Sequence, residues 1–133
     1  MSLFVDASVL VAILTREDDA DAFLDRLDGV HRAITSPIAV FESVLAIARK
    51  RVSPLHEARR DLAEFTTEAG IDVVDLNERD SEAAIEAFSR FGKGRHRAGL
   101  NMGDCFAYAC AKSRRVRLLC KGDDFIHTDI EIA

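Results

Sequence analysis

The sequence predicts an α/β sandwich, in which helices cover a short parallel sheet. Short apolar segments alternate along the chain with longer segments of helical periodicity, which is the pattern of parallel strands joined by helices. Proline and glycine stand where several of these helices begin and end. No linker or internal repeat divides the 133 residues, so we expect residues 1–133 to form a single domain.

The first half of the chain predicts two strands and four helices. In order, they are a strand at 3–5, helices at 8–14 and 18–27, a strand at 32–35, a helix at 38–51 and a helix that follows Pro54 and ends at 69. Ser8 is the candidate N-cap of the first helix, and Gly29 follows the second. Pro37 and Pro54 each follow a serine and mark the start of a helix, and Gly70 takes the C′ position of the fourth helix.

The second half continues the same alternation. In order, we expect a strand at 71–74, a helix at 81–91, a loop at 92–99, a helix that ends at 113, a strand at 117–120 and a candidate last strand at 130–132. Asn77 or Asp80 opens the first of these helices, and Asn101 or Gly103 opens the second. Parallel sheets carry their functional sites at the carboxyl ends of the strands, so the residues that follow each strand are the first candidates.

The composition excludes several classes of protein. A formal net charge of −5 argues against a protein that coats nucleic acid electrostatically, although an enzyme can act on nucleic acid through metal ions. No stretch approaches the ~20 apolar residues that span a bilayer, and no basic segment precedes the apolar start, so neither a membrane span nor a signal peptide is expected. The three cysteines form no CxxC pair and are expected to be buried free thiols of a cytoplasmic protein.

One carboxylate, Asp6, stands inside an apolar run. Apart from Asp6 and Ser8, every residue from 3 to 14 is apolar, so this segment belongs in the core. A lone ionised carboxylate in a core costs several kcal/mol unless it is paired, hydrogen-bonded or bound to a metal ion. Because the first basic residue in the sequence is Arg16, the compensation for Asp6 must come from elsewhere in the chain.

Four further acids stand at comparable places, after a strand or in the first turns of a helix. They are Glu42, Asp104, Asp123 and Asp124. Each has a simpler interpretation alone, such as a favourable charge at a helix start for Asp104 or a turn residue for Asp123 and Asp124. A parallel sheet gathers such positions at one edge, where like charges repel unless a hard cation such as Mg²⁺ or Mn²⁺ binds. Together they predict an acidic metal site that bridges a phosphate-bearing substrate.

Four segments with acids resemble those of PIN-domain ribonucleases of the VapC type, the toxins of bacterial toxin–antitoxin pairs. The segments are VDASVL at 5–10, SPIAVFE at 36–42, LNMGDCFAYA at 100–109 and LLCKGDDF at 118–125. The resemblance spans nearly the whole chain and implies a PIN-like three-layer sandwich. It also implies a metal-dependent endoribonuclease, a homodimer and inhibition by a VapB-type antitoxin. The alternative is a degenerate PIN domain that binds RNA or protein without catalysis.

The resemblance further implies a set of site residues. Asp6, Glu42, Asp104 and Asp123 are expected to be the catalytic acids and to hold Mg²⁺ or Mn²⁺, as one ion or two, with Asp124 in support or in place of Asp123. Ser8 follows Asp6 closely enough to hydrogen-bond a carboxylate or a phosphate, unless it only caps its helix.

Asn101 is expected to cap the helix that carries Asp104, with orientation of that acid as the alternative. RNA contacts are expected from the basic residues of the preceding loop, unless that loop is only solvated. These candidates are Lys93, Arg95, His96 and Arg97.

Overall fold

The computed structural model describes residues 1–133 and contains a four-stranded, fully parallel sheet with strand order β3-β2-β1-β4. The strands are β1 (Ser2–Val5), β2 (Arg32–Thr35), β3 (Ile71–Val73) and β4 (Arg117–Leu119). In the central pairs, Phe4 lies opposite Ile34 and Val5 lies opposite Leu119. The carboxyl ends of β1, β2 and β4 are therefore level, and the residues that follow them emerge at one edge of the sheet.

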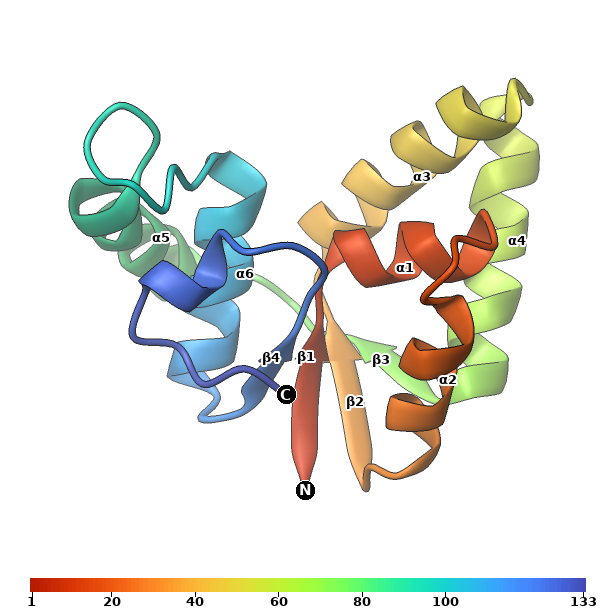
Figure 1. Cartoon of the computed structure of the whole chain (residues 1–133), viewed down its shortest axis with the longest axis horizontal. Helices are drawn as coiled ribbons and strands as arrows, with labels where there is room; N and C mark the ends of the chain where they lie inside the picture. The colour runs from red at the N-terminus through yellow and green to blue at the C-terminus, as the bar shows by residue number, and fades with distance from the viewer.

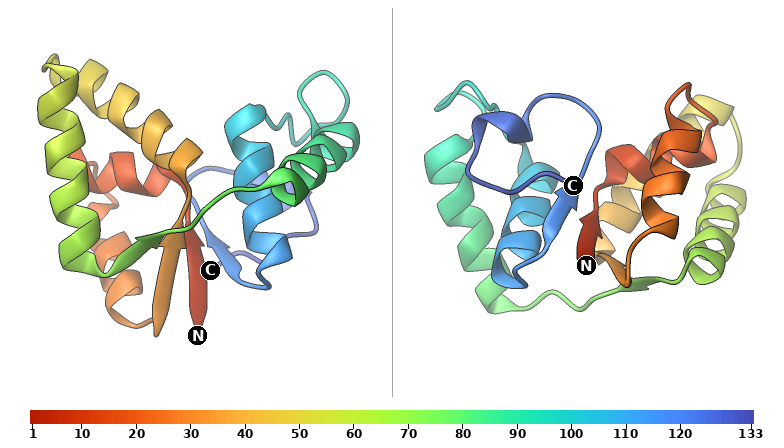
Figure 2. Two further views of the ribbon diagram at one scale, coloured as in Figure 1. Left: turned by 180° about the vertical axis from the view of Figure 1, so that it is seen from behind. Right: turned by 60° about the horizontal axis from the view of Figure 1, so that its bottom comes forward.

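Six helices complete the three layers. Four of them, α1 (Ala7–Leu14), α2 (Ala20–Asp28), α3 (Pro37–Arg51) and α4 (Leu55–Ala69), cover one face of the sheet, and α5 (Glu78–Phe91) and α6 (Met102–Ser113) cover the other (Figure 1). The connection from β3 to α5 crosses the sheet from one helical layer to the other (Figure 2). A short 3₁₀ helix, η1 (Phe125–His127), follows β4. This arrangement confirms the predicted α/β sandwich.

The strands divide their side chains between two hydrophobic clusters. Phe4 and Leu118 belong to the cluster on the α5 and α6 side, whereas Leu3, Val5 and Leu119 belong to the cluster on the side of the other four helices. Successive residues of a strand point to opposite faces, so β1, β2 and β4 each supply both clusters, whereas β3 supplies only Ile71 to one of them. Helices cover both faces of the sheet, which explains why the strand residues in these clusters are apolar and why the strands hold the residues at their carboxyl ends rigidly.

Several helix starts differ from those expected, since α2 begins at Ala20 rather than 18 and α3 at Pro37 rather than 38. Helix α1 begins at Ala7, and its N-cap is Asp6 rather than Ser8, because the Asp6 carboxylate accepts the hydrogen bond from the Ser8 amide. Helix α5 begins at Glu78, three residues before the predicted start, with Asn77 as its N-cap. Asp and Asn cap helices as well as Ser does, so the pattern of residue types alone could not fix these boundaries.

The later strands are shorter than the sequence predicts. The candidate last strand at 130–132 is reduced to one parallel bridge, between Ile132 and Leu118, and the two predicted strands that precede it each end one residue earlier than expected. The three cysteines are free, with Cys105 and Cys110 buried and Cys120 partly buried. None of the helices is long and apolar enough to cross a bilayer.

Candidate active site

The carboxyl edge of the sheet carries the predicted acids. Asp6 directly follows β1, Glu42 lies in the second turn of α3, and Asp104 lies in the first turn of α6. The starts of α1 and α3 flank this edge on one side, and the start of α6 flanks it on the other (Figure 1). All three carboxylates line one cleft of about 510 Å³. The structure therefore brings together three of the four acids that the sequence predicts, from segments nearly 100 residues apart.

Asp6 is buried and is held by its own helix start. Only 7% of the residue is exposed. The Ser8 hydroxyl donates to Asp6 Oδ2 at 2.6 Å, and the Ser8 amide donates to the same atom at 3.1 Å. The Lys121 amide donates to Ser8 Oγ at 2.9 Å, which leaves the hydroxyl proton directed at the carboxylate. Burial raises the pKa of Asp6, the hydrogen bonds from Ser8 oppose that rise, and no basic side chain contributes to lowering it.

Glu42 reaches the cleft across the bare backbone of Gly103. A Cβ atom at Gly103 would lie 2.1–2.3 Å from the carboxylate atoms of Glu42, far inside any contact that real Cβ atoms make. Glycine at this position therefore admits the carboxylate to the space beside α6. Burial, followed by the charges of Asp6 and Asp104, raises the pKa of Glu42 to about 7.

Asp104 has a structural counterpart elsewhere in the chain, at Asp80. Both lie at the third position of a helix whose Asn N-cap accepts a hydrogen bond from the aspartate amide, while the aspartate carboxylate accepts one from the amide of that Asn. The local bonds are the same, yet the pKa of Asp80 is lowered and that of Asp104 is raised to about 6. A capping role alone therefore does not account for the electrostatics of Asp104.

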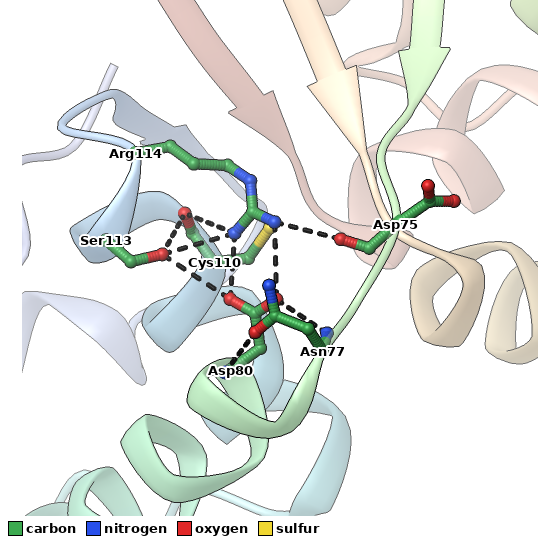
Figure 3. Close-up of polar contacts among 6 residues, drawn as sticks. All are labelled: Asp75, Asn77, Asp80, Cys110, Ser113 and Arg114. Carbon is green, nitrogen blue, oxygen red and sulfur yellow. Dashed lines mark hydrogen bonds and ion pairs between the residues drawn. The ribbon is translucent and has the colours of Figure 1, made fainter.

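Asp80 differs from Asp104 because the positive charge of Arg114 pairs with its carboxylate. Arg114 donates from its two terminal nitrogens to the two Asp80 oxygens at 2.9 and 3.3 Å, and also to the Asp75 carbonyl at 2.9 Å (Figure 3). This pair fastens the end of α6 to the start of α5, which is a structural role. At Asp104, burial dominates, and the charges of Asp6 and Asp124 add to it, so the rise in pKa reflects an acid without a cation.

Asp124, rather than Asp123, acts on the cluster. Both side chains are exposed in the turn that follows β4, where Gly122 adopts a φ of +94°. The charge of Asp124 contributes to raising the pKa of Asp6 and of Asp104, whereas Asp123 is not among the groups that do so. Neither residue lines the cleft, so the choice of Asp123 as the fourth acid stays a prediction, and the charge of Asp124 favours Asp124 as its alternative.

The acids fit a hard divalent cation in charge and chemistry. As the side chains are placed, no three His, Cys, Asp or Glu residues are arranged to hold one ion together. Mg²⁺ does not require three, because proteins commonly bind it through one or two carboxylates and it keeps several waters. Burial and the charges of nearby acids raise the pKa of Asp6, Glu42 and Asp104, with Asp124 as the acid that acts on Asp6, and a bound dication would relieve that repulsion.

The rim of the cleft contains charged residues that the sequence analysis did not single out. Glu17 accepts hydrogen bonds from Lys121 and, at 2.6 Å, from Lys50, and these two lysines lower its pKa to about 2. The negative charge of Glu17 is thus balanced by two lysines, which distinguishes it from Asp6, Glu42 and Asp104. Arg49 also lines the cleft, on the same face of α3 as Glu42. Its spacing of seven residues from Glu42, two helical turns, was the signal in the sequence that could have identified it.

The basic loop lies apart from the cleft lining. Lys93, Arg95, His96 and Arg97 are not among the residues that line the cleft. The Arg95 guanidinium lies 5.6 Å from the centre of the Phe88 ring, and His96 packs edge-on against an aromatic ring of α5. Their role in binding RNA therefore stays a prediction. Asn101 does cap α6, and the same pair of hydrogen bonds orients Asp104, so both interpretations of Asn101 hold together.

Comparison with known proteins gives a consistent result. The family model described as PIN domain matches residues 3–131. The ribonuclease VapC30 of Mycobacterium tuberculosis is 40% identical over 128 residues, which cover 96% of this chain and 95% of that protein. A VapC ribonuclease of Rhizobium meliloti is 37% identical over 139 residues, with 96% and 98% of the two chains covered.

Solved structures share the fold at low sequence identity. The crystal structure of Mycobacterium tuberculosis VapC20, described as a sarcin-ricin loop cleaving toxin, superposes with a TM-score of 0.77 at 17% identity, covering 98% of each chain. VapBC2 from Rickettsia felis, solved with a DNA fragment from its promoter, gives a TM-score of 0.74 at 14% identity, covering 99% of this chain and 96% of that one.

Proposed function

Since this chain belongs to the PIN-domain family and, within it, to the VapC ribonucleases, we propose that it is a metal-dependent endoribonuclease that hydrolyses RNA phosphodiester bonds. One observation carries the proposal. Three carboxylates from separate segments line one cleft, and burial and the charges of nearby acids raise the pKa of each, while no cation of the chain pairs with them. Such a site is costly for folding, which is typical of a site kept for function. A degenerate, non-catalytic PIN domain would have no use for all of these acids.

Asp6 and Asp104 are the principal metal ligands in this proposal, and Mg²⁺ or Mn²⁺ is the ion. Glu42 and Asp124 complete the site directly or through water, with Asp124 in place of Asp123 because its charge acts on the cluster. When bound, such an ion lowers the pKa of water and stabilises negative charge on a phosphate.

The residues of the chain hold these acids in place. Ser8 fixes the Asp6 carboxylate through two hydrogen bonds, and the Asn101 amide fixes one oxygen of Asp104 and leaves the other free. Glu42 accepts no hydrogen bond from the protein, and glycine at position 103 gives its carboxylate room in the cleft. Glu42 is therefore free to take up a proton from the attacking water while Asp6 and Asp104 stay in fixed orientations.

The biological setting that we propose is that of a toxin in a VapBC pair. The chain would act in the cytoplasm as a homodimer and be inhibited by a VapB-type antitoxin. Apolar side chains beside the acids support a surface that a partner covers, since Phe41 and Met102 are 65% and 66% exposed on the helices that carry Glu42 and Asp104. Free thiols are consistent with a reducing compartment.

The test is a cleavage assay with purified protein and a set of labelled single-stranded RNAs. The wild type is expected to cleave the RNA in the presence of Mg²⁺ or Mn²⁺, and cleavage should cease when the metal is chelated. Asp104→Asn keeps the shape of the side chain and removes its charge, so we expect it to fold and to lose cleavage. The structural Asp80→Asn variant serves as the matched control and should retain cleavage wherever it remains folded. Cleavage by folded, metal-loaded Asp104→Asn at the wild-type rate would refute the assignment.

A further inference from the structure

Arg49 shares a helix face with Glu42 at the cleft. Residues 42, 45, 46 and 49 of α3 all line the cleft, at the spacing that places side chains on one side of a helix. With a rise of 1.5 Å per residue, Arg49 lies about 10 Å from Glu42 along the helix axis. Arg49 therefore lines the same cleft as the acids, and it forms no ion pair with any of them.

Arg49 is also the one basic residue of the cleft lining that has no acidic partner within the protein. Only Arg49 and Lys121 bring positive charge to the cleft lining. Lys121 binds Glu17 and lies 3.3 Å from Asp19. The neighbouring Lys50 binds Glu17 at 2.6 Å, and Arg51 binds Asp61 at 2.8 Å. No hydrogen bond or ion pair engages Arg49, and its side chain is exposed.

We infer that Arg49 binds a backbone phosphate of the RNA that flanks the scissile phosphate. The inference rests on the proposed function, because it assigns the substrate contact of the same cleft. A chain with a net charge of −5 has to attract a polyanion locally, and an unpaired guanidinium beside the acids does so. Arginine suits the task because its planar donors bind phosphate in pairs. A contact two helical turns from Glu42 would fix the strand without crowding the acids.

The test separates binding from cleavage. In the non-cleaving Asp104→Asn background, affinity for a labelled single-stranded RNA is measured as a function of salt concentration. Adding Arg49→Ala is expected to weaken binding about tenfold and to make the salt dependence shallower by about 0.7 in logarithmic slope, the amount for one phosphate contact on a single strand. Arg49→Lys keeps the charge, so it should keep the slope while losing part of the affinity. In the wild-type background, Arg49→Ala should raise KM more than it lowers kcat.

The matched control is Arg59→Ala, which removes the same charge from an exposed residue of α4 that has no ion pair and does not line the cleft. Equal affinity and equal salt slope for the Arg49 and Arg59 variants would overturn the inference, even if the wild type cleaves RNA as proposed. Conversely, a wild type that cleaves no RNA would refute the proposed function, while a specific loss of RNA binding in Arg49→Ala would still support the contact.

Discussion

Replacing Gly103 by alanine should move the Glu42 carboxylate while leaving the protein folded. The new Cβ would lie 2.1 Å from Glu42 Oε2, and ordinary van der Waals contact begins at 3.4 Å, so the carboxylate has to retreat by about 1.3 Å. The obstacle is the end of a flexible side chain, which other rotamers can accommodate. Alanine is also a better helix former than glycine by about 0.8–1.0 kcal/mol, so α6 itself is not weakened.

Activity is expected to fall although stability does not. A displacement of about 1 Å in a catalytic group can cost on the order of 100-fold in rate, so we expect Gly103→Ala to lose about that factor in RNA cleavage. Initial rates on a labelled RNA, with thermal melting in parallel, measure both quantities. Gly29→Ala is the control, because its new Cβ would meet only carbonyl oxygens at 3.7 and 3.9 Å, far from the cleft.

A double substitution shows whether Glu42 transmits the effect. If displacement of Glu42 is the whole cause, Gly103→Ala should reduce the rate no further in a Glu42→Ala background. Wild-type cleavage by a folded Gly103→Ala protein would refute the reasoning, and so would a full additional loss in the double variant. Either result would mean that Glu42 does not act from its position beside Gly103.

The remaining predictions concern charge. The pKa of Glu42 is raised to about 7 and that of Asp104 to about 6, so the metal-free folded state holds protons that the unfolded chain releases. The free energy of unfolding should therefore fall as pH rises from about 4 to 7. Denaturant titrations in chelator that show no such fall would contradict these raised pKa values. Mn²⁺ at 100 times its Kd should add about 2.7 kcal/mol of stability at pH 7, visible as a higher Tm, and Asp104→Asn should lose most of that gain. Asp80→Ala removes the charged partner of the partly exposed Arg114 and should cost about 1.5–3 kcal/mol, whereas Asp18→Ala, at an exposed site, should cost little. Equal melting of the two variants would contradict the structural role of the pair.

Much of the fold follows from local patterns. The strand at 32–35 and the last residues of α3 and α4 lie where the sequence predicts them, and Gly70 takes the left-handed conformation that ends α4. Ser36 caps α3, which begins one residue before the predicted start. The same local signals were ambiguous at the start of α1. Asp6 and Ser8 are both good N-caps, and only the folded backbone shows that Ser8 donates to Asp6 instead.

The candidate site depended on information that local patterns do not contain. Asp123 and Asp124 share one turn, so their order in the sequence says nothing of which charge acts on the other acids. Gly103 carries no chemistry of its own, and its importance appears only when α3 and α6 are placed together. Nearness in sequence to Asp104 favoured the loop at 92–99 for RNA binding, whereas helical spacing brings Arg49 to the cleft.

Anomalous diffraction from crystals soaked in Mn²⁺ would locate the ion independently of activity and so decide whether the acids of the cleft bind metal. A manganese peak is expected in the cleft, within coordination distance of Asp6 and Asp104, and it should be lost in Asp104→Asn crystals. A peak confined to other carboxylates, or none in the cleft at millimolar Mn²⁺, would contradict the claim that these acids form a metal-dependent nuclease site.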